Sequence, residues 1–159
     1  MKIKNSFCTG SFVLLLFLTA SVYAQSAEPL NPFEQFIGEW KLNNSLQVFE
    51  WGPGKTSVIG KSYRISETSR TLVSEGMWFW HPGEQQIKGY VTATNMPVSF
   101  FDYTTTFENG RMISDLSAYD KKGNKSSYKE LMELTSDSTY KWTLMQQGEV
   151  VMERLFRRK

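Results

Sequence analysis

From Glu39 to the end of the chain, hydrophobic and polar residues alternate in short runs that are rich in aromatic and β-branched side chains. Runs of this kind, separated by turn dipeptides such as Asn109-Gly110, are typical of β-strands joined by tight turns. The pattern predicts roughly nine strands, near residues 39–51, 56–66, 70–80, 86–94, 98–107, 111–119, 126–134, 139–146 and 149–157.

A different pattern precedes these runs. Asn31 followed by Pro32 is typical of the start of a helix, with Asn31 as the N-cap and Pro32 in the first turn. Phe33 and Phe36 recur at the spacing that places them on one helical face, and Gly38 ends the pattern. The sequence therefore predicts a short helix ahead of the first strand.

The connections between the predicted strands are too short to hold crossover helices, so consecutive strands should pair in an antiparallel meander. Such a sheet exposes two edges unless it closes on itself. We therefore expect an all-β fold, an up-and-down meander closed into a barrel, as one domain over residues 25–159. A sandwich of two sheets is the alternative architecture.

The first residues have the layout of a secretory signal. Lys2 and Lys4 precede an uncharged apolar run over residues 12–22, and small residues end at Ala24. The run is shorter than the roughly 20 residues that span a bilayer. Residues 1–24 are therefore predicted to be a cleaved signal peptide, leaving no transmembrane segment. The protein is expected in the periplasm, with full secretion as the alternative.

Cleavage would change the chemistry available to the chain. The only cysteine, Cys8, would be lost, so the mature protein would have no thiol for a disulfide, a nucleophile or a metal site. Loss of Lys2 and Lys4 would leave 16 basic and 16 acidic residues. Without a net positive charge or a basic stripe, nucleic-acid binding is not expected.

The entry to the first predicted strand resembles a known family. Gly38-Glu39-Trp40, directly after the short helix, is similar to the Gly-x-Trp entry of lipocalins and related calycins, and especially to small secreted bacterial lipocalin-like proteins. The resemblance implies a barrel with an internal ligand cavity. It also implies that Trp40 closes one end beneath a C-terminal arginine, with Arg157 or Arg154 as the candidate.

His81 is the only histidine and lies in the sequence Trp80-His81-Pro82-Gly83. A haem ligand, or a general base paired with Glu84, is one interpretation. A solvent-exposed turn residue is the other, and we favour it because a Pro-Gly turn follows directly. We therefore predict no cofactor. With one histidine and no cysteine, we also predict no metal site.

Polar and aromatic residues alternate along several strands, which suggests a cavity that is aromatic and partly wet. Candidate cavity residues are Tyr63, Glu75, Trp78, Tyr90, Phe100, Tyr128, Glu130 and Trp142. A slip of one residue in register inverts the two faces of a strand, so we expect about half of them to face inward. They should converge at the end of the barrel opposite Trp40.

The sequence favours a non-enzymatic protein that binds a small, partly apolar molecule, and it makes no prediction of oligomeric state. Two alternatives remain. One is an interaction module, an inhibitor or accessory subunit, that uses exposed tryptophans as anchors, namely Trp51, Trp78 or Trp80. The other is an enzyme whose acid or base is a carboxyl group of raised pKa, namely Glu75, Glu130 or Asp102.

Overall fold

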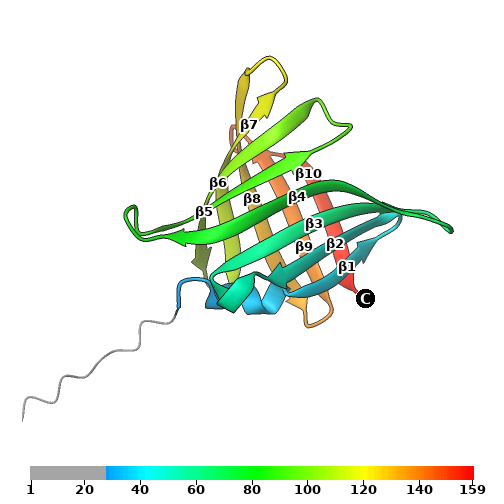
Figure 1. Cartoon of the computed structure of the whole chain (residues 1–159), viewed down its shortest axis with the longest axis horizontal. Helices are drawn as coiled ribbons and strands as arrows, with labels where there is room; N and C mark the ends of the chain where they lie inside the picture. The colour runs from blue at the N-terminus through cyan, green and yellow to red at the C-terminus, as the bar shows by residue number, and fades with distance from the viewer. Residues whose placement is uncertain (1–27) are drawn as a thin grey trace, which may run out of the picture.

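The computed structural model describes residues 28–159, and the predicted signal peptide lies outside the described residues. Ten strands form a closed barrel in which each pairs antiparallel with its neighbour in sequence and the last pairs with the first (Figure 1). The predicted all-β meander closed into a barrel is confirmed. The strands are β1 (Gly38–Leu42), β2 (Ser45–Trp51), β3 (Ser57–Ile65), β4 (Arg70–His81), β5 (Gln86–Ala93), β6 (Val98–Glu108), β7 (Arg111–Asp120), β8 (Lys125–Ser136), β9 (Thr139–Gln146) and β10 (Glu149–Arg158).

The prediction of a single strand over residues 39–51 was wrong. A hairpin turn at Asn43 and Asn44 divides it into β1 and β2, with Leu42 opposite Ser45. Asn43 has a φ of 49°, a backbone conformation that asparagine tolerates better than most residues. Because the turn contains two residues, the alternation of apolar and polar positions continues through it, and the pattern alone reads as one long strand.

The predicted helix is a 3-10 helix, η1 (Asn31–Phe36), and it crosses one end of the barrel (Figure 1). Leu30 occupies the N-cap position, and no side chain caps the helix, so the predicted role of Asn31 was wrong. Phe33 and Phe36 are fully buried. The helix therefore closes the barrel end with apolar side chains, while η2 (Pro53–Lys55) is a single turn between β2 and β3.

Aromatic side chains fill the barrel beneath η1. The ring of Tyr140 stacks on that of Phe156 with centroids 4.9 Å apart, and it meets the edge of Trp40 at 4.8 Å. Phe36 adds an edge contact with Tyr140 at 6.0 Å. Rings in these geometries gain energy beyond the area that they bury. This end of the barrel is therefore packed solid.

Trp40 and the C-terminal strand hold the end of η1. The indole N–H of Trp40 donates to the carbonyl of Phe36 at 2.7 Å. The guanidinium of Arg158 donates to the carbonyls of Gln35 at 2.9 Å and Ile37 at 2.8 Å, and its Cζ lies 4.1 Å from the Trp40 ring centroid. Carbonyls at the end of a helix lack partners within it, and a cation is favoured there.

The arginine over Trp40 is thus Arg158, and the expectation of Arg157 or Arg154 was wrong. Residues of one strand alternate between faces, and Arg158 is the register partner of Trp40, whereas Arg157 pairs with Lys41 on the outer face. Arg154 has the same parity as Arg158 but lies earlier on β10, opposite Trp142 of β9 and away from Trp40. Gly38 permits the contact, because a Cβ there would lie 2.9 Å from Nη1 of Arg158 and its φ is +127°.

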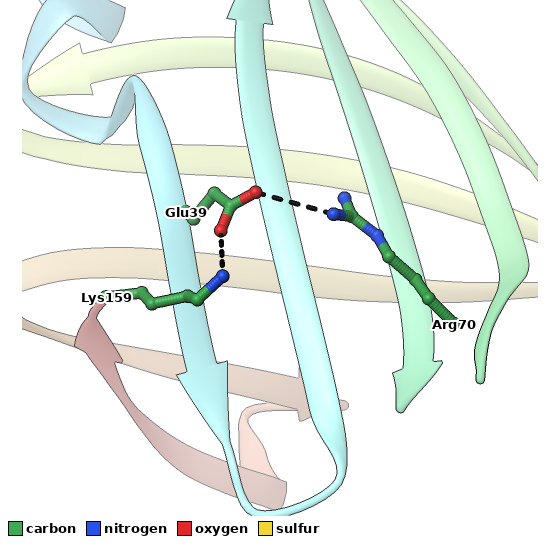
Figure 2. A network of polar contacts seen from close by, with 3 residues as sticks. All are labelled: Glu39, Arg70 and Lys159. Atoms are coloured by element: carbon green, nitrogen blue, oxygen red, sulfur yellow. Dashed lines mark hydrogen bonds and ion pairs between the residues drawn. The ribbon is translucent and has the colours of Figure 1, made fainter. Parts of the chain in front are cut away.

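Ion pairs on the outer wall reinforce the seam between β1 and β10 (Figure 2). The carboxylate of Glu39 accepts from Lys159 at 2.8 Å and from Arg70, at the start of β4, at 3.5 Å. The hydrogen bond from Lys159 is the main reason that the pKa of Glu39 is lowered. Arg70 also lies over the ring of Tyr63, 3.8 Å from its centroid. The cluster thus joins β1 to the C-terminal residue that follows β10 and to the start of β4.

Replacing Arg158 with glutamine should lower the free energy of unfolding by about 1–2 kcal/mol. The variant loses the hydrogen bonds to the carbonyls of Gln35, Ile37 and, from Nε at 3.2 Å, Asp137, together with the cation-π contact, at a partly solvated site. Arg157→Gln is the matched control, since it removes the same charge from the adjacent, outward position. Urea denaturation of both variants measures the difference. Equal effects of the two substitutions would contradict the role given to Arg158.

Candidate functional site

The barrel encloses a cavity of about 210 Å³ on the far side of Trp78 from η1. Trp78 forms its floor, since its ring contacts Phe33 of η1 at a centroid distance of 6.0 Å and also borders the cavity. The cavity reaches the loop between β5 and β6 at Met96, which is 49% exposed. Its other lining residues include Gln47, Phe49, Ser62, Ser74, Val91, Ala93, Phe101, Tyr103, Glu130, Met132 and Trp142.

Two glycines make room for the floor. A Cβ on Gly60 of β3 would lie 2.7 Å from the Trp78 ring, and one on Gly89 of β5 would lie 2.7 Å from it as well. Gly89 is the direct register partner of Trp78. The indole can therefore lie flat against the barrel wall, which leaves space above it.

Glu130 is the central polar group of the cavity. It lies on β8, where Glu130 and Met132 face inward while Lys129 faces outward and pairs with Asp115 at 2.8 Å. The Glu130 side chain is only 8% exposed. One carboxyl oxygen, Oε1, accepts a hydrogen bond from the indole of Trp142 on β9.

Two residues that line the cavity each have a buried polar atom with no hydrogen-bond partner within residues 28–159, namely Oε2 of Glu130 and Nε1 of Trp78. An unpaired polar group inside a protein costs roughly 1–3 kcal/mol. Other buried polar groups nearby are paired, since the Tyr140 hydroxyl donates to Gln47 and Thr105 bonds Ser114 at 2.9 Å. Glu130 and Trp78 are therefore the cavity residues whose side chains have a buried polar atom without a partner in the described part of the chain.

Burial raises the pKa of the Glu130 carboxyl from 4.5 to about 7, although the hydrogen bond from Trp142 acts in the opposite direction. Removing water disfavours the charged form of an acid. Burial also raises the pKa of Tyr103 and Tyr140, and the charge of Glu130 adds to both increases. Near neutral pH the carboxyl can thus be either a neutral donor or a charged acceptor.

Half of the predicted cavity residues face inward. Trp78, Glu130 and Trp142 line the cavity. Tyr128 also faces inward, opposite Leu116, and packs on a second apolar cluster formed by Tyr103, Leu116 and Ala118.

The other four candidates, Tyr63, Glu75, Tyr90 and Phe100, lie on the outer face, so their assignment to the cavity is corrected. Glu75 and Trp78 are three residues apart on one strand and have opposite faces. Glu75 pairs across the outer face with Lys61 of β3 and Thr92 of β5. Tyr90 pairs with Asp102 on the same face.

Tyr103, Phe101 and Gln47 line the cavity but were not predicted. For β6 the signal is present in the sequence, because residues 101, 103 and 107 are aromatic whereas 102, 104 and 106 are Asp, Thr and Thr. Phe100 has the parity of Asp102 and lies on the outer face with it, opposite Thr92. Gln47 gives no such signal, because its face follows only from its pairing with Trp40.

The other candidates for chemistry lie elsewhere. His81 is the last residue of β4, directly before the turn to β5, its side chain is 42% exposed, and Nδ1 accepts from the backbone N–H of Glu84 at 3.1 Å. Asp102 faces outward. Of the proposed anchors, Trp78 is buried, and Trp51 and Trp80 pack against the core.

Within residues 28–159, no group of three or more His, Cys, Asp or Glu side chains is arranged to hold a metal ion. No helix in the same part of the chain is long and apolar enough to cross a membrane. Comparisons with protein-family models, with curated proteins and with solved structures found no match to this chain.

The raised pKa of Glu130 predicts that this residue lowers the free energy of unfolding by an amount that depends on pH. Between pH 4.5 and 7 the unfolded state releases a proton that the folded state retains, so stability falls as pH rises and the loss is complete above 7. Relative to wild type, Glu130→Gln should therefore gain about 3 kcal/mol between pH 4.5 and pH 8, at 1.36 kcal/mol per pH unit.

Urea unfolding of wild type and Glu130→Gln at a series of pH values measures this gain. Glu133→Gln is the matched control, because Glu133 lies on the outer face of the same strand, opposite Lys141. A difference between wild type and Glu130→Gln that does not change with pH would contradict the raised pKa.

Proposed function

We propose that this protein is an exported, lipocalin-like barrel that binds a small, partly apolar molecule in its cavity without catalysing a reaction. The observation that carries the proposal is a cavity lined mainly by aromatic and apolar side chains, in which two lining residues each have a buried polar atom without a partner in residues 28–159, namely Glu130 Oε2 and Trp78 Nε1. Binding sites for small molecules are concave and mostly apolar, with a few polar groups that orient the ligand.

The size of the barrel supports this interpretation. A barrel of eight strands has an interior that side chains just fill or that holds one small ligand, and the diameter grows with the number of strands. With ten strands, the interior accommodates both the aromatic packing under η1 and a cavity above it. An engineered apolar cavity of about 150 Å³ holds benzene, so 210 Å³ suits a molecule of one ring with a short side chain.

The likeness to lipocalins rests on the strand entry. The contact of Arg158 with Trp40 behind Gly38 matches the arrangement that the resemblance implies, with a different arginine. Lipocalin barrels have eight strands, and this barrel has ten. The proposal therefore takes the cavity, and not the strand number, as the shared feature.

Filling the cavity should abolish binding. Ala93 lines the cavity and its neighbour Thr92 faces outward, so Ala93→Phe adds a ring inside and Thr92→Phe adds the same ring outside. We expect at least one of toluene, benzyl alcohol, benzylamine and benzoate to quench tryptophan fluorescence saturably with one site. The Ala93→Phe variant should weaken this binding by about tenfold or more, as overpacked sites reject ligands, and Thr92→Phe should not.

Absence of saturable binding by all four probes, or equal binding by the two phenylalanine variants, would contradict the proposal. Circular dichroism of both variants separates loss of binding from loss of the fold.

Export is supported by the charged start, apolar run and small residues that end at Ala24. N-terminal sequencing of the protein recovered from outside the cytoplasm should therefore find Gln25, or a residue within a few positions of it, as the first residue. Recovery of exported protein that begins at Met1 would contradict cleavage.

A further inference from the structure

Glu130 is the only carboxyl group among the described residues that line the cavity. None of the ion pairs formed by residues 28–159 includes it. Lys61 borders the cavity, but its ammonium is paired with Glu50 of β2. Arg154 of β10 is exposed and does not line the cavity, and its guanidinium donates to the carbonyl of Glu153. The protein therefore provides a buried acid and no cation to neutralise it.

A buried carboxylate is tolerated where a positive charge and hydrogen-bond donors compensate for lost water. The Trp142 indole supplies one donor, to Oε1, whereas Oε2 has no partner among the described residues. A ligand ammonium would supply both the missing charge and a donor for Oε2. An anionic ligand would instead place two negative charges in one desolvated space, which is strongly unfavourable.

The walls of the cavity also suit a cation. The rings of Trp78 and Tyr103 lie with centroids 5.6 Å apart, and Trp142 and Phe49 border the same space. Aromatic faces attract cations through their quadrupoles, with larger effect where water is excluded. The same rings provide apolar contact for the body of the ligand.

We propose that the ligand is a small one-ring or similarly sized amine, bound as its ammonium with Oε2 of Glu130. This inference rests on the proposed function and specifies the chemical class of the molecule in the cavity. Trp78 Nε1, the second open atom, would donate to an acceptor on the ligand where it carries one.

The test compares benzylamine with benzyl alcohol, which has nearly the same shape and no charge, at pH 8. Wild type should bind benzylamine at least about tenfold more tightly than benzyl alcohol, as expected for a hydrogen bond to a charged group. Glu130→Gln should lose this preference, with a weaker amine affinity and an alcohol affinity close to that of wild type. Glu133→Gln should behave as wild type.

The pH profile gives a readout in the unmutated protein. The titratable side chains whose pKa responds to the charge of Glu130 are Tyr103 of β6 and Tyr140 of β9, and both have a raised pKa, so they stay neutral from pH 5 to 8. Lys61, which also borders the cavity, is paired with Glu50. Below about 7 the amine must displace the proton of Glu130. Benzylamine affinity should therefore rise roughly tenfold per pH unit from 5 to 7 and then level off, while benzyl alcohol affinity should show no such rise.

The outcomes separate the two proposals. If benzyl alcohol or toluene binds in the cavity as tightly as benzylamine, or if Glu130→Gln retains the amine preference, the amine inference is overturned and the binding barrel stands. If no probe binds, both are overturned. Preferential binding of benzoate would also contradict the amine inference.

Discussion

Closure of the sheet between β1 and β10 is the constraint on which the rest of the structure depends. This seam contains two paired positions, Trp40 with Arg158 and Lys41 with Arg157, so backbone pairing there is the shortest in the barrel. Side chains extend it on both faces. Inside, Arg158 connects the last strand to Trp40 and to the carbonyls that end η1. Outside, Glu39 holds Lys159 and Arg70. Without closure, both strands would be free edges and the interior would open to water.

The closed wall divides the interior into two parts with different packing. Beneath η1, Phe36, Trp40, Tyr140 and Phe156 leave no room, and the polar atoms of Trp40 and Tyr140 are hydrogen-bonded. Above Trp78 the packing stops, and the polar atoms that border the space are not all satisfied. The rigid end therefore sets the position of Trp78, which is the floor of the cavity. Gly60 and Gly89 determine how close to the wall that floor lies.

Sequence pattern predicted the architecture well because turns and alternation are local. Eight of the nine expected strands lie within two residues of their observed bounds. The exception is the strand predicted over residues 39–51, because the turn at Asn43 leaves the alternation of apolar and polar residues unbroken. Inward and outward faces were harder to assign. On β5 the pattern distinguishes Ile87, Gly89 and Val91 from Gln86 and Lys88, so Tyr90 could have been placed outside. On β3, Val58 and Ile59 are equally apolar, and only pairing with β2 and β4 decides their faces.

Glu130 shows why the cavity itself was the least predictable feature. The sequence correctly indicated that Glu130 faces inward. That no cation pairs with it could not be predicted, because this depends on the side chains of every neighbouring strand. Lys61 pairs with Glu50 on the outer face, and Arg158 donates to a carbonyl at the end of η1. The resulting carboxyl destabilises the empty barrel at neutral pH, since its pKa is raised to about 7. An apolar residue at this position would remove that cost but would leave the indole N–H of Trp142 without its acceptor. The proposed ammonium ligand would instead neutralise the carboxyl and keep this hydrogen bond. The same destabilisation would then be recovered on binding, which ties the stability of the barrel to its occupancy.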